Sequence, residues 1–499
     1  MYKHHKFSQD LRRSQNKETH ERYDKRRADL QRTDDAVRTH RRMFTHFAAV
    51  FAACFLLPGL FAAGCTRYEP AALESGVKET DSAELELFAE QPLETKAETA
   101  EEIRTPVAAK GIYLAASPVA NEEFLNETIE ALDQTELNAV VIDVKDDFGR
   151  ITYDMQNVPL AKELGAVSKT AGDLPAVIKK LREHGVYCIA RIVALKDPYL
   201  AEKKPEWALH TADGSLFRDK SGDAWVDPYQ EAYWEYLVSV AKEAGRIGFD
   251  EIQFDYIRFC TERETEAVVY DPLLTKGRDK ISIITELVTY LSESLRREGL
   301  FVSCDVFGSI IGSSLDAQSV GQDYDQMASA LDYICPMIYP SHYSSGNFGL
   351  EHPDLAPYDC ILGALKQSKT VLSSYEGYKQ AAVRPWLQAF TASYLGEGNY
   401  MEYGADAIRQ QIEAVYDAGY DEWILWSASA KYDYSALLTE ADGEAEASKR
   451  KETRRAEEAQ RAQTEETLPQ ELEAELSDGE LSESDAEILE QDGPIVISE

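Results

Sequence analysis

The apolar positions between about residues 110 and 440 follow two periods that alternate along the chain. Short runs that are apolar throughout or at every second position are typical of β-strands. Eight such runs lie at residues 110–116, 138–144, 186–193, 249–255, 301–308, 331–339, 383–390 and 422–428. We therefore expect eight strands in this region.

Amphipathic segments with a helical period separate these runs. The clearest of them, DLPAVIKKLREHG, has Asp173 as its N-cap, Pro175 in its first turn and Gly185 as its stop signal. Further helices are expected at residues 121–134, 227–245, 281–297, 324–330 and 404–419, with an irregular helical segment after residue 339. Strands and helices thus alternate through the whole region.

The number of strands and the length of the region predict the fold. Eight strands that alternate with helices over some 330 residues match a (β/α)8 TIM barrel in number and size. The competing fold is a doubly wound open sheet, which is expected to carry a glycine-rich phosphate turn after its first strand. The segment GIYLAASPVAN, from Gly111 to Asn121, contains no such turn. We therefore predict an α/β chain with a TIM barrel at residues 110–440.

The two ends of the chain differ in composition from this body. Residues 66–109 are rich in Glu, Ala, Thr and Ser, with few aromatics, and we expect them to form an acidic, solvated linker. Residues 441–499 are strongly acidic and have too few apolar residues to build a core. This tail is expected to be disordered, and the alternative is an exposed charged helix. The barrel is thus predicted to carry disordered N- and C-terminal extensions.

Residues 1–65 combine a basic extension with an export signal. Arg41 and Arg42 precede a long apolar run that ends in small residues, which is the pattern of a secretory signal peptide. The end of this run, Leu60-Phe61-Ala62-Ala63-Gly64-Cys65, resembles the lipobox of bacterial lipoproteins. The resemblance implies cleavage before Cys65, lipidation of its thiol, and a membrane-anchored, extracytoplasmic protein of the cell envelope. The alternative is a single uncleaved membrane anchor, for which about 20 apolar residues suffice.

Charge and cysteine content exclude several classes of function. A formal net charge of −37 argues against nucleic acid as a partner, since lysine and arginine must neutralise its phosphates. Five of the seven cysteines lie in the body, without CxxC spacing, and three of them stand in apolar strand-like runs. We expect buried free thiols, no metal site and no cofactor. A metal-dependent deacetylase is also disfavoured, because the four histidines of the body lack ligand spacing.

Two strands end on an aspartate, which raises the question of their purpose. In a TIM barrel the active site lies at the C-terminal ends of the strands. Asp255 ends the strand in GFDEIQFDYIRF, and Asp305 lies near the end of the next strand in FVSCDVFG. Hydrolysis of a glycosidic bond requires two carboxyl groups, one ionised and one protonated. We therefore predict Asp255 as nucleophile or charge stabiliser and Asp305 as general acid/base, although an aspartate at a strand end can also cap a turn.

Other polar and aromatic residues are expected at the same rim. Carboxylates and amides bind sugar hydroxyls, and aromatic rings stack on the apolar faces of pyranoses. The predicted substrate-binding residues are Asp143, Arg191, Arg258, Tyr339, His342, Gln388 and Trp426. Each has a structural alternative, which is an ion pair for the arginines and a core position for the tryptophan. Asp146 and Asp147 precede Gly149, so we expect them to form a turn.

Three stretches together carry a family resemblance. TELNAVVIDVKDDFGRITYD, GFDEIQFDYIRF and GQDYDQMASALDYICPMIYPSHY resemble a bacterial family of proposed glycoside hydrolases with a TIM-barrel domain. The resemblance covers about residues 110–437 and implies the fold and the broad reaction class. The fourth strand is similar to the chitinase pattern at Asp255, but this chain has Ile257 at the position of the catalytic glutamate of chitinases. An amylase-like pair on strands four and five is the nearer analogy for Asp255 and Asp305.

Together these patterns predict an exported, lipid-anchored glycoside hydrolase that acts on an envelope or extracellular polysaccharide or oligosaccharide. The alternative is a non-catalytic carbohydrate-binding protein on a degenerate TIM barrel, which would keep the aromatic rim and lose turnover. Binding of a glycan without release of a product would distinguish the second from the first.

Overall fold

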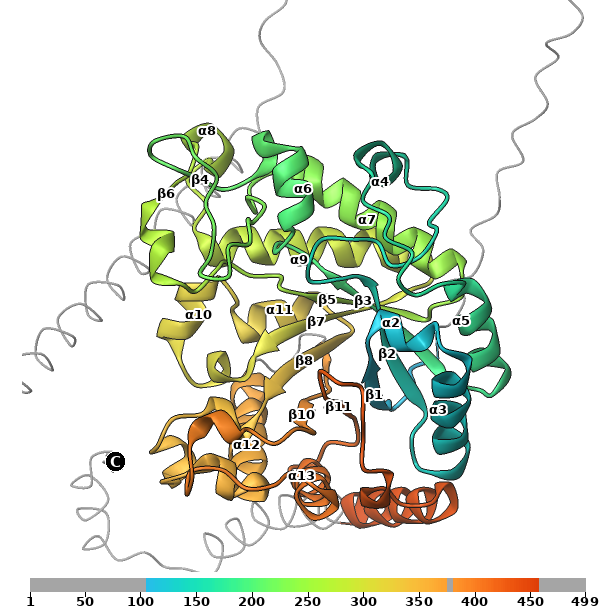
Figure 1. Ribbon diagram of the computed structural model, residues 1–499. Helices are drawn as coiled ribbons and strands as arrows, with labels where there is room; N and C mark the ends of the chain where they lie inside the picture. The colour runs from blue at the N-terminus through green and yellow to red at the C-terminus, as the bar shows by residue number, and fades with distance from the viewer. Residues whose placement is uncertain (1–104, 375–379, 457–499) are drawn as a thin grey trace, which may run out of the picture. The chain divides into compact units, whose positions relative to one another are not determined.

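The computed structural model describes residues 105–374 and 380–456 (Figure 1). The predicted signal peptide with Cys65, the linker up to residue 104 and the tail beyond residue 456 lie outside these residues. No helix in the described part of the chain is both long and apolar enough to cross a bilayer.

Eight parallel strands form a closed barrel at the centre of the molecule (Figure 1). They are β1 (Lys110–Leu114), β2 (Ala139–Lys145), β3 (Tyr187–Val193), β5 (Glu251–Asp255), β7 (Phe301–Phe307), β8 (Tyr333–Ile338), β10 (Trp386–Gln388) and β11 (Trp423–Trp426). Neighbouring strands pair in this order, and β11 pairs with β1. The barrel closes where Trp386 of β10 aligns with Met337 of β8. The predicted TIM barrel is confirmed, with every strand at its expected place.

The strand before the last is interrupted. The two-residue strand β9 (Ala382–Val383) pairs with the start of β8, and β10 pairs with its end. Pro385 lies between the two pieces. Proline has no N–H to donate to the ladder, which accounts for the break.

Helices surround the strands on the outside (Figure 1). They are α3 (Glu122–Gln134), α5 (Leu174–Glu183), α7 (Glu231–Arg246), α9 (Lys280–Arg296), α11 (Tyr324–Ala330), α12 (Pro357–Ser373) and α13 (Ala405–Asp417). The expected N-cap of α5 is present, because the Asp173 carboxylate accepts a hydrogen bond from the N–H of Ala176. Asn121 caps α3 and Asp279 caps α9 in the same way.

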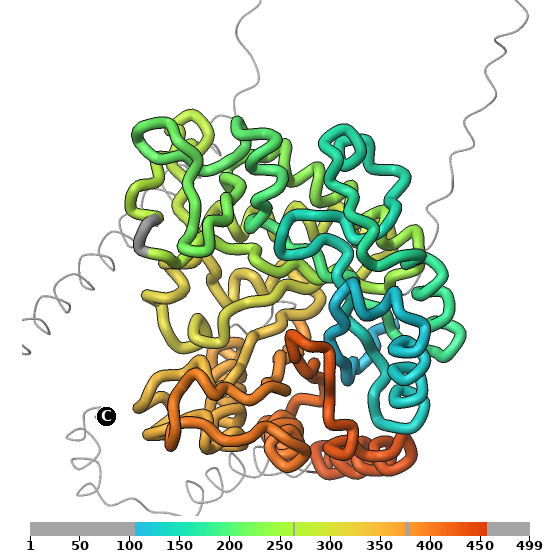
Figure 2. Tube along the Cα trace, in the orientation of Figure 1, coloured from blue at the N-terminus to red at the C-terminus, as the bar shows by residue number. Residues whose placement is uncertain are grey.

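Residues 440–456 form a further helix that completes the ring after β11. It lies beside α13 and the end of α3, as the red tube in Figure 2 shows. The guanidinium of Arg450 lies 3.6 Å from the ring centroid of Tyr416 in α13, and Arg454 is ion-paired with Asp421. For this part of the predicted acidic tail, the helical alternative applies. Its arginines attach it to the barrel, so an apolar face is not its only source of stability.

The connections between the barrel strands and helices contain short helices, a pair of short strands and 3-10 turns. The helices are α2 (Ala116–Val119), α4 (Pro159–Leu164), α6 (Pro198–Lys203), α8 (Pro272–Thr275) and α10 (Ser314–Val320). Strands β4 (His210–Thr211) and β6 (Val268–Val269) form a separate antiparallel pair. The 3-10 turns are η1 (Pro205–Trp207), η2 (Arg263–Ala267), η3 (Gly308–Ile311), η4 (Pro340–His342), η5 (Asn347–Gly349), η6 (Pro353–Leu355), η7 (Ser393–Leu395) and η8 (Tyr434–Ala436).

Successive residues of each strand face two different cores. In β7, Val302, Cys304 and Val306 pack in the layer between strands and helices, whereas Phe301 packs inside the barrel. The barrel interior also holds Tyr113, Val141, Tyr187, Ile189, Tyr333, Trp386 and Ile424. Because the side-chain period of a strand is two, each strand presents alternate residues to the barrel axis. The inward positions nearest the C-terminal ends are therefore available to the site.

A buried ionic network occupies the barrel interior away from those ends. Nη1 of Arg384 lies 2.8 Å from Oε1 of Glu251, and its Nε lies 2.8 Å from Oε2 of Glu422. Glu251 also accepts hydrogen bonds from the hydroxyls of Ser303 and Tyr187. The side chains of Arg384 and Glu251 are fully buried. Such charges persist in a core only when they are paired and hydrogen-bonded.

The five cysteines of the described region, Cys188, Cys260, Cys304, Cys335 and Cys360, are buried and free. This confirms the expectation of buried free thiols. Burial raises the pKa of each thiol, so these cysteines are held in the neutral, unreactive form.

Candidate functional site

A cavity of about 1000 Å³ opens at the C-terminal ends of the barrel strands. Five of its lining residues are aspartates or arginines, namely Asp147, Arg191, Asp255, Arg258 and Asp305. Both predicted catalytic residues thus line one cavity. They reach it because Asp255 ends β5 and Asp305 occupies an inward position of the adjacent strand β7.

Arg191 is the centre of the charge network at this rim. Its Nη1 lies 2.7 Å from Oδ1 of Asp143, and its Nη2 lies 2.9 Å from Oδ1 of Asp147. Nη2 and Nε also contact Oδ2 of Asp255, at 2.6 Å and 3.0 Å. The planar guanidinium fork has enough donors to serve three carboxylates at once, which a lysine could not do. Arg191 therefore joins the ends of β2, β3 and β5.

Asp255 is held from both of its oxygens. Oδ2 accepts the two bonds from Arg191, and Oδ1 accepts the N–H of Tyr256 at 2.6 Å. Tyr256 has a φ of 49°, which is the left-handed region that non-glycine residues rarely adopt. Strained backbone of this kind persists where the surroundings fix it, and it is concentrated at functional sites. Tyr256 thus combines a left-handed backbone with the N–H that binds Oδ1 of Asp255.

Asp305 lies in a different environment. It is 2% exposed, and its Oδ1 accepts a hydrogen bond of 2.6 Å from Nε1 of Trp386. Burial raises the pKa of Asp305 well above its ordinary range, and the negative charge of Asp255 raises it further. The hydrogen bond from Trp386 and the charge of Arg191 oppose this shift without reversing it. Asp305 is therefore the carboxyl group of the cavity that favours the protonated form.

Asp143 is ion-paired with Arg191 but lies outside the lining of the cavity. Its Oδ2 accepts a hydrogen bond of 2.5 Å from the hydroxyl of Tyr113, and its Oδ1 pairs with Arg191. It is 5% exposed, and its side chain does not line the cavity. Burial raises the pKa of Asp143, although the charge of Arg191 counteracts the shift. The predicted substrate contact of Asp143 is therefore replaced by a positioning role, since Arg191 and Tyr113 occupy its oxygens.

Aromatic rings form one wall of the cavity. The ring of Trp426 lies 5.3 Å from that of Phe390, 5.8 Å from that of Tyr339 and 6.5 Å from that of Tyr113, centroid to centroid. Trp426 and Tyr339 thus line the cavity, and their contact with a substrate stays a prediction. Tyr394 lines the same cavity and is 68% exposed, which places an aromatic side chain at the mouth. Such a surface can stack on the apolar face of a sugar ring.

Arg258 lies on the cavity wall and is surrounded by rings. Its guanidinium carbon is 4.4 Å from the centroid of Phe307, 5.0 Å from that of Tyr256 and 5.4 Å from that of Trp225. Its Nη1 donates a hydrogen bond to the carbonyl of Phe259. Arg258 thus lines the cavity, and its contact with a substrate stays a prediction.

His342 and Gln388 differ in their placement. His342 lines the cavity, and burial lowers its pKa, which favours the neutral ring. Gln388 is fully buried and does not line the cavity. Its amide accepts hydrogen bonds from Ser341 and donates to Asp354. The prediction of Gln388 as a substrate contact is wrong, because these neighbours occupy the amide and it fixes the loop after β8 instead.

The turn after β2 separates two aspartates that the sequence analysis treated together. Oδ1 of Asp146 accepts the N–H groups of Phe148 and Arg150, which is the expected turn. Asp147 instead lines the cavity and pairs with Arg191. Both residues thus belong to the expected turn, but the place of the Asp147 side chain at the cavity was not predicted. Successive side chains along a strand point to opposite sides. This alternation could have indicated that Asp146 and Asp147 face different ways.

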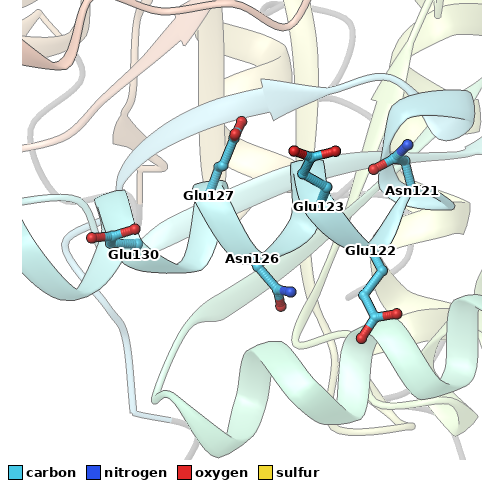
Figure 3. A pocket seen from close by; sticks show the side chains of 6 residues that line it. All are labelled: Asn121, Glu122, Glu123, Asn126, Glu127 and Glu130. Atoms are coloured by element: carbon cyan, nitrogen blue, oxygen red, sulfur yellow. The ribbon is translucent and has the colours of Figure 1, made fainter.

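A second, open hollow of about 590 Å³ lies on the outer face of α3 (Figure 3). Its side chains are Asn121, Glu122, Glu123, Asn126, Glu127 and Glu130, all from one helix. An acidic outer face is the ordinary solvated side of an amphipathic helix. In the described residues, no group of three or more His, Cys, Asp or Glu is arranged to hold a metal ion.

Several solved structures are similar to the chain. A hypothetical protein from Ruminiclostridium thermocellum is 38% identical, covers 39% of this chain and 97% of its own, and has a TM-score of 0.36. The PgaB (BpsB) glycoside hydrolase domain from Bordetella bronchiseptica is 12% identical over 67% of this chain and 99% of its own, with a TM-score of 0.47. The α-galactosidase TtGalA from Thermus thermophilus is 14% identical over 69% and 62%, with a TM-score of 0.39. No curated protein matches the sequence.

The family comparison covers the barrel itself. Residues 111–432 match a family model described as "Putative glycosyl hydrolase domain". The matched range runs from β1 to just after β11, so it contains every strand of the barrel and the whole cavity. The chain therefore belongs to this glycosyl hydrolase family, and its body is a glycoside hydrolase domain with a TIM-barrel fold.

Proposed function

We propose that the barrel hydrolyses O-glycosidic bonds of an envelope or extracellular polysaccharide, with Asp255 and Asp305 as its two carboxyl groups. The observation that carries the proposal is the contrast between these two side chains in one cavity. Asp255 is ion-paired with Arg191, whereas burial and the charge of Asp255 raise the pKa of Asp305. Glycosidases need one ionised and one protonated carboxyl group, and environments of opposite kind provide them.

In this mechanism Asp305 donates its proton to the glycosidic oxygen as the bond between that oxygen and the anomeric carbon breaks. The carboxylate of Asp255 stabilises the positive charge that develops at the anomeric carbon, as nucleophile or as counter-ion. A water molecule then adds to that carbon, and the proton it loses returns to the carboxyl pair. Trp426 and the rings around it provide the surface on which the sugar lies.

Arg191 has a positioning role in the proposed reaction. By holding Oδ2 of Asp255 it aims the carboxylate and leaves the neighbourhood of Oδ1 as the side that can face the substrate. Asp143 and Tyr113 fix Arg191 in turn. Support of this kind keeps catalytic groups within the small tolerances that proximity effects require.

The test is a reducing-end assay on the full chain, purified in detergent, against bacterial envelope and plant polysaccharides. The variants are Asp255→Asn and Asp305→Asn, and the matched control is Asp316→Asn, which changes an exposed aspartate on α10. We expect release by the parent and the control, and a loss of at least about 100-fold in both cavity variants. Release that survives Asp255→Asn would contradict its assignment. Glycan binding without release from any polysaccharide would favour the carbohydrate-binding alternative.

The location of the protein is a second part of the proposal. We propose export and attachment to the cell envelope through lipid on Cys65, supported by the lipobox-like ending Leu60–Cys65 after the apolar run. Labelling with a fatty-acid analogue, followed by membrane fractionation, tests this. Cys65→Ser should lose the label, and the control Cys54→Ser should keep it. Absence of the label from both the parent and Cys54→Ser would contradict lipidation.

A further inference from the structure

The two arginines that line the cavity differ in how their charges are compensated. Arg191 contacts three carboxylates, those of Asp143, Asp147 and Asp255. Among the residues that the structure describes, no carboxylate lies within ion-pair distance of Arg258. Its one hydrogen bond goes to the neutral carbonyl of Phe259. Arg258 is therefore the arginine of the cavity wall that forms no ion pair with a described residue.

The surroundings of Arg258 hold it in place without neutralising it. Three aromatic rings, those of Phe307, Tyr256 and Trp225, pack around the guanidinium. Cation–π contacts fix a guanidinium plane but leave its edge N–H groups free to donate. Burial lowers the pKa of Arg258, and the negative charges of Asp255 and Asp219 oppose this shift without reversing it. An anion in the cavity, next to the guanidinium, would favour its charged form.

The cavity wall also carries a second hydrogen-bond donor, the hydroxyl of Ser309. Ser309 lines the same cavity two residues after Phe307, at the start of η3. Its side chain is exposed, and its hydroxyl has no hydrogen-bond partner among the described residues. Arg258 and Ser309 are thus two donors on the wall of one cavity, and each can donate a hydrogen bond to a carboxylate oxygen.

The cavity's own carboxyl groups do not prevent an anion from binding there. Asp147 and Asp255 are ion-paired with Arg191, and Asp305 favours its protonated form. Asp147 and Asp255 therefore already have a cationic partner in Arg191. A single carboxylate would give Arg258 the ion-pair partner that it lacks among the described residues.

We propose that Arg258 binds a carboxylate carried by a sugar of the substrate, so that the glycan recognised by this cavity is an acidic one. The inference rests on the proposed function for the identity of the site as a glycan site. Two sources have the same chemistry, the C6 carboxylate of a hexuronic acid and the lactyl ether carboxylate of muramic acid. Both present a planar, singly charged group to which a guanidinium can donate two hydrogen bonds.

The experiment measures binding and release separately, on the full chain in detergent. The probes are oligogalacturonate and a glycan strand of alternating N-acetylglucosamine and N-acetylmuramic acid. Each is compared with its carboxyl-reduced form, in which the acid has become a neutral alcohol and the rest of the chain is unchanged. Binding is measured in the Asp305→Asn background to prevent turnover, and release is measured with the parent.

We expect at least one acidic probe to bind ten times or more tightly than its carboxyl-reduced form. The probe that shows the preference identifies the source of the carboxylate. Arg258→Gln should abolish the preference and leave binding of the reduced form within about twofold, and Arg258→Lys should restore part of it. The control Arg297→Gln removes an exposed arginine beyond α9 and should change nothing.

Equal binding of the acidic and the reduced forms by the parent would overturn the inference, and this comparison needs no variant to fold. A preference that survives Arg258→Gln in a folded protein would also overturn it. Release from neutral glycans without an acidic preference would leave the hydrolase proposal standing and remove the role of Arg258. Acidic preference without release from any probe would support Arg258 and remove the hydrolase proposal.

Discussion

Arg191 and Asp255 meet through two hydrogen bonds that end on the same carboxylate oxygen. Nη2 and Nε of Arg191 lie 2.6 Å and 3.0 Å from Oδ2 of Asp255. The other oxygen, Oδ1, accepts only the N–H of Tyr256 among the described residues. The arginine therefore sets the direction of the carboxylate as well as compensating its charge.

This relationship predicts that charge alone cannot replace Arg191. Arg191→Lys keeps a positive charge but loses the fork that reaches Asp143, Asp147 and Asp255 together. We expect kcat to fall about 100-fold with a much smaller change in KM, because the variant disturbs the aim of Asp255 rather than sugar binding. Steady-state kinetics on the polysaccharide that the parent cleaves measures both values. A change confined to KM would show instead that Arg191 contacts the substrate.

The same network predicts a cost in stability when its centre is removed. Arg191→Met leaves the buried carboxylates of Asp143 and Asp255 without their cation. We expect the free energy of unfolding to fall by roughly 3–5 kcal/mol, as when one partner of a buried ion pair is deleted. Urea denaturation followed by far-UV circular dichroism measures it. The exposed variant Arg297→Gln is the control and should change the value by less than about 0.5 kcal/mol.

Trp426 is predicted to contribute binding rather than chemistry. It contacts Phe390, Tyr339 and Tyr113 on the cavity wall and carries no titratable group. Trp426→Ala should weaken glycan binding about tenfold or more, and Trp426→Phe should weaken it less, because a smaller ring still stacks. Isothermal titration with the cleaved polysaccharide in the Asp305→Asn background measures this. Unchanged binding in Trp426→Ala would show that the ring only fills the core.

The fold could be predicted from the sequence because its signals are local. Each strand shows its own apolar run, and caps such as Asp173 and Asn121 mark helix starts within a few residues. The inward position of Asp305 follows from the period of two along β7. These signals depend on neighbours in the chain, so no knowledge of distant contacts was needed.

The pairing inside the site could not be predicted in this way. Arg191 is 48, 44 and 64 residues from its partners Asp143, Asp147 and Asp255, and sequence spacing does not say which charges meet. For the same reason the sequence did not show that the amide of Gln388 is hydrogen-bonded to Ser341 and Asp354, which lie in the connection after β8. Position at a strand end indicates the rim, but occupancy by other side chains decides whether a group faces the cavity.

The network around Arg384 offers a test that separates folding from the site. Arg384→Met leaves Glu251 and Glu422 buried or partly buried without their cation, and it should lower the free energy of unfolding by about 3–5 kcal/mol. The double variant Arg384→Met with Glu251→Leu should recover part of this loss, because it removes the buried charge of Glu251 and leaves only Glu422 without its cation. Chemical denaturation measures both. Because neither residue lines the cavity, kcat per folded molecule should stay close to that of the parent.

Asp227 is predicted to cost stability at neutral pH. Burial raises its pKa from an ordinary value of 3.8 to about 6. The folded state thus binds the proton more tightly than the unfolded state, and stability falls as pH rises from about 4 to about 6. Asp227→Asn keeps an oxygen for the N–H of Tyr229 and removes the charge. It should raise the free energy of unfolding by roughly 3 kcal/mol at pH 8 and by about half of that at pH 5.

Denaturation curves at these two pH values check the sign of the effect. Asp316→Asn, at an exposed position, is the control and should give the same small difference at both. A gain in stability that is larger at pH 5 than at pH 8 would contradict a raised pKa for Asp227.

Asp305 should set the alkaline limit of catalysis. Burial and the charge of Asp255 raise its pKa, so the protonated acid persists to higher pH than for an ordinary aspartate. As pH rises through that pKa, the proton donor is lost and kcat/KM should fall. In Asp305→Asn this alkaline limb should disappear, together with most of the activity on polysaccharide.

A substrate that needs no proton distinguishes this role from simple damage to the cavity. The 4-nitrophenyl glycoside of the released sugar has a leaving group that departs as an anion, so Asp305→Asn should lose far less activity on it than on polysaccharide. Asp255→Asn should lose activity on both, because charge at the anomeric carbon develops in either case. The pH profiles of the parent and both variants on the two substrates measure this. Equal losses on both substrates in Asp305→Asn would remove its assignment as general acid, since only proton donation depends on the leaving group.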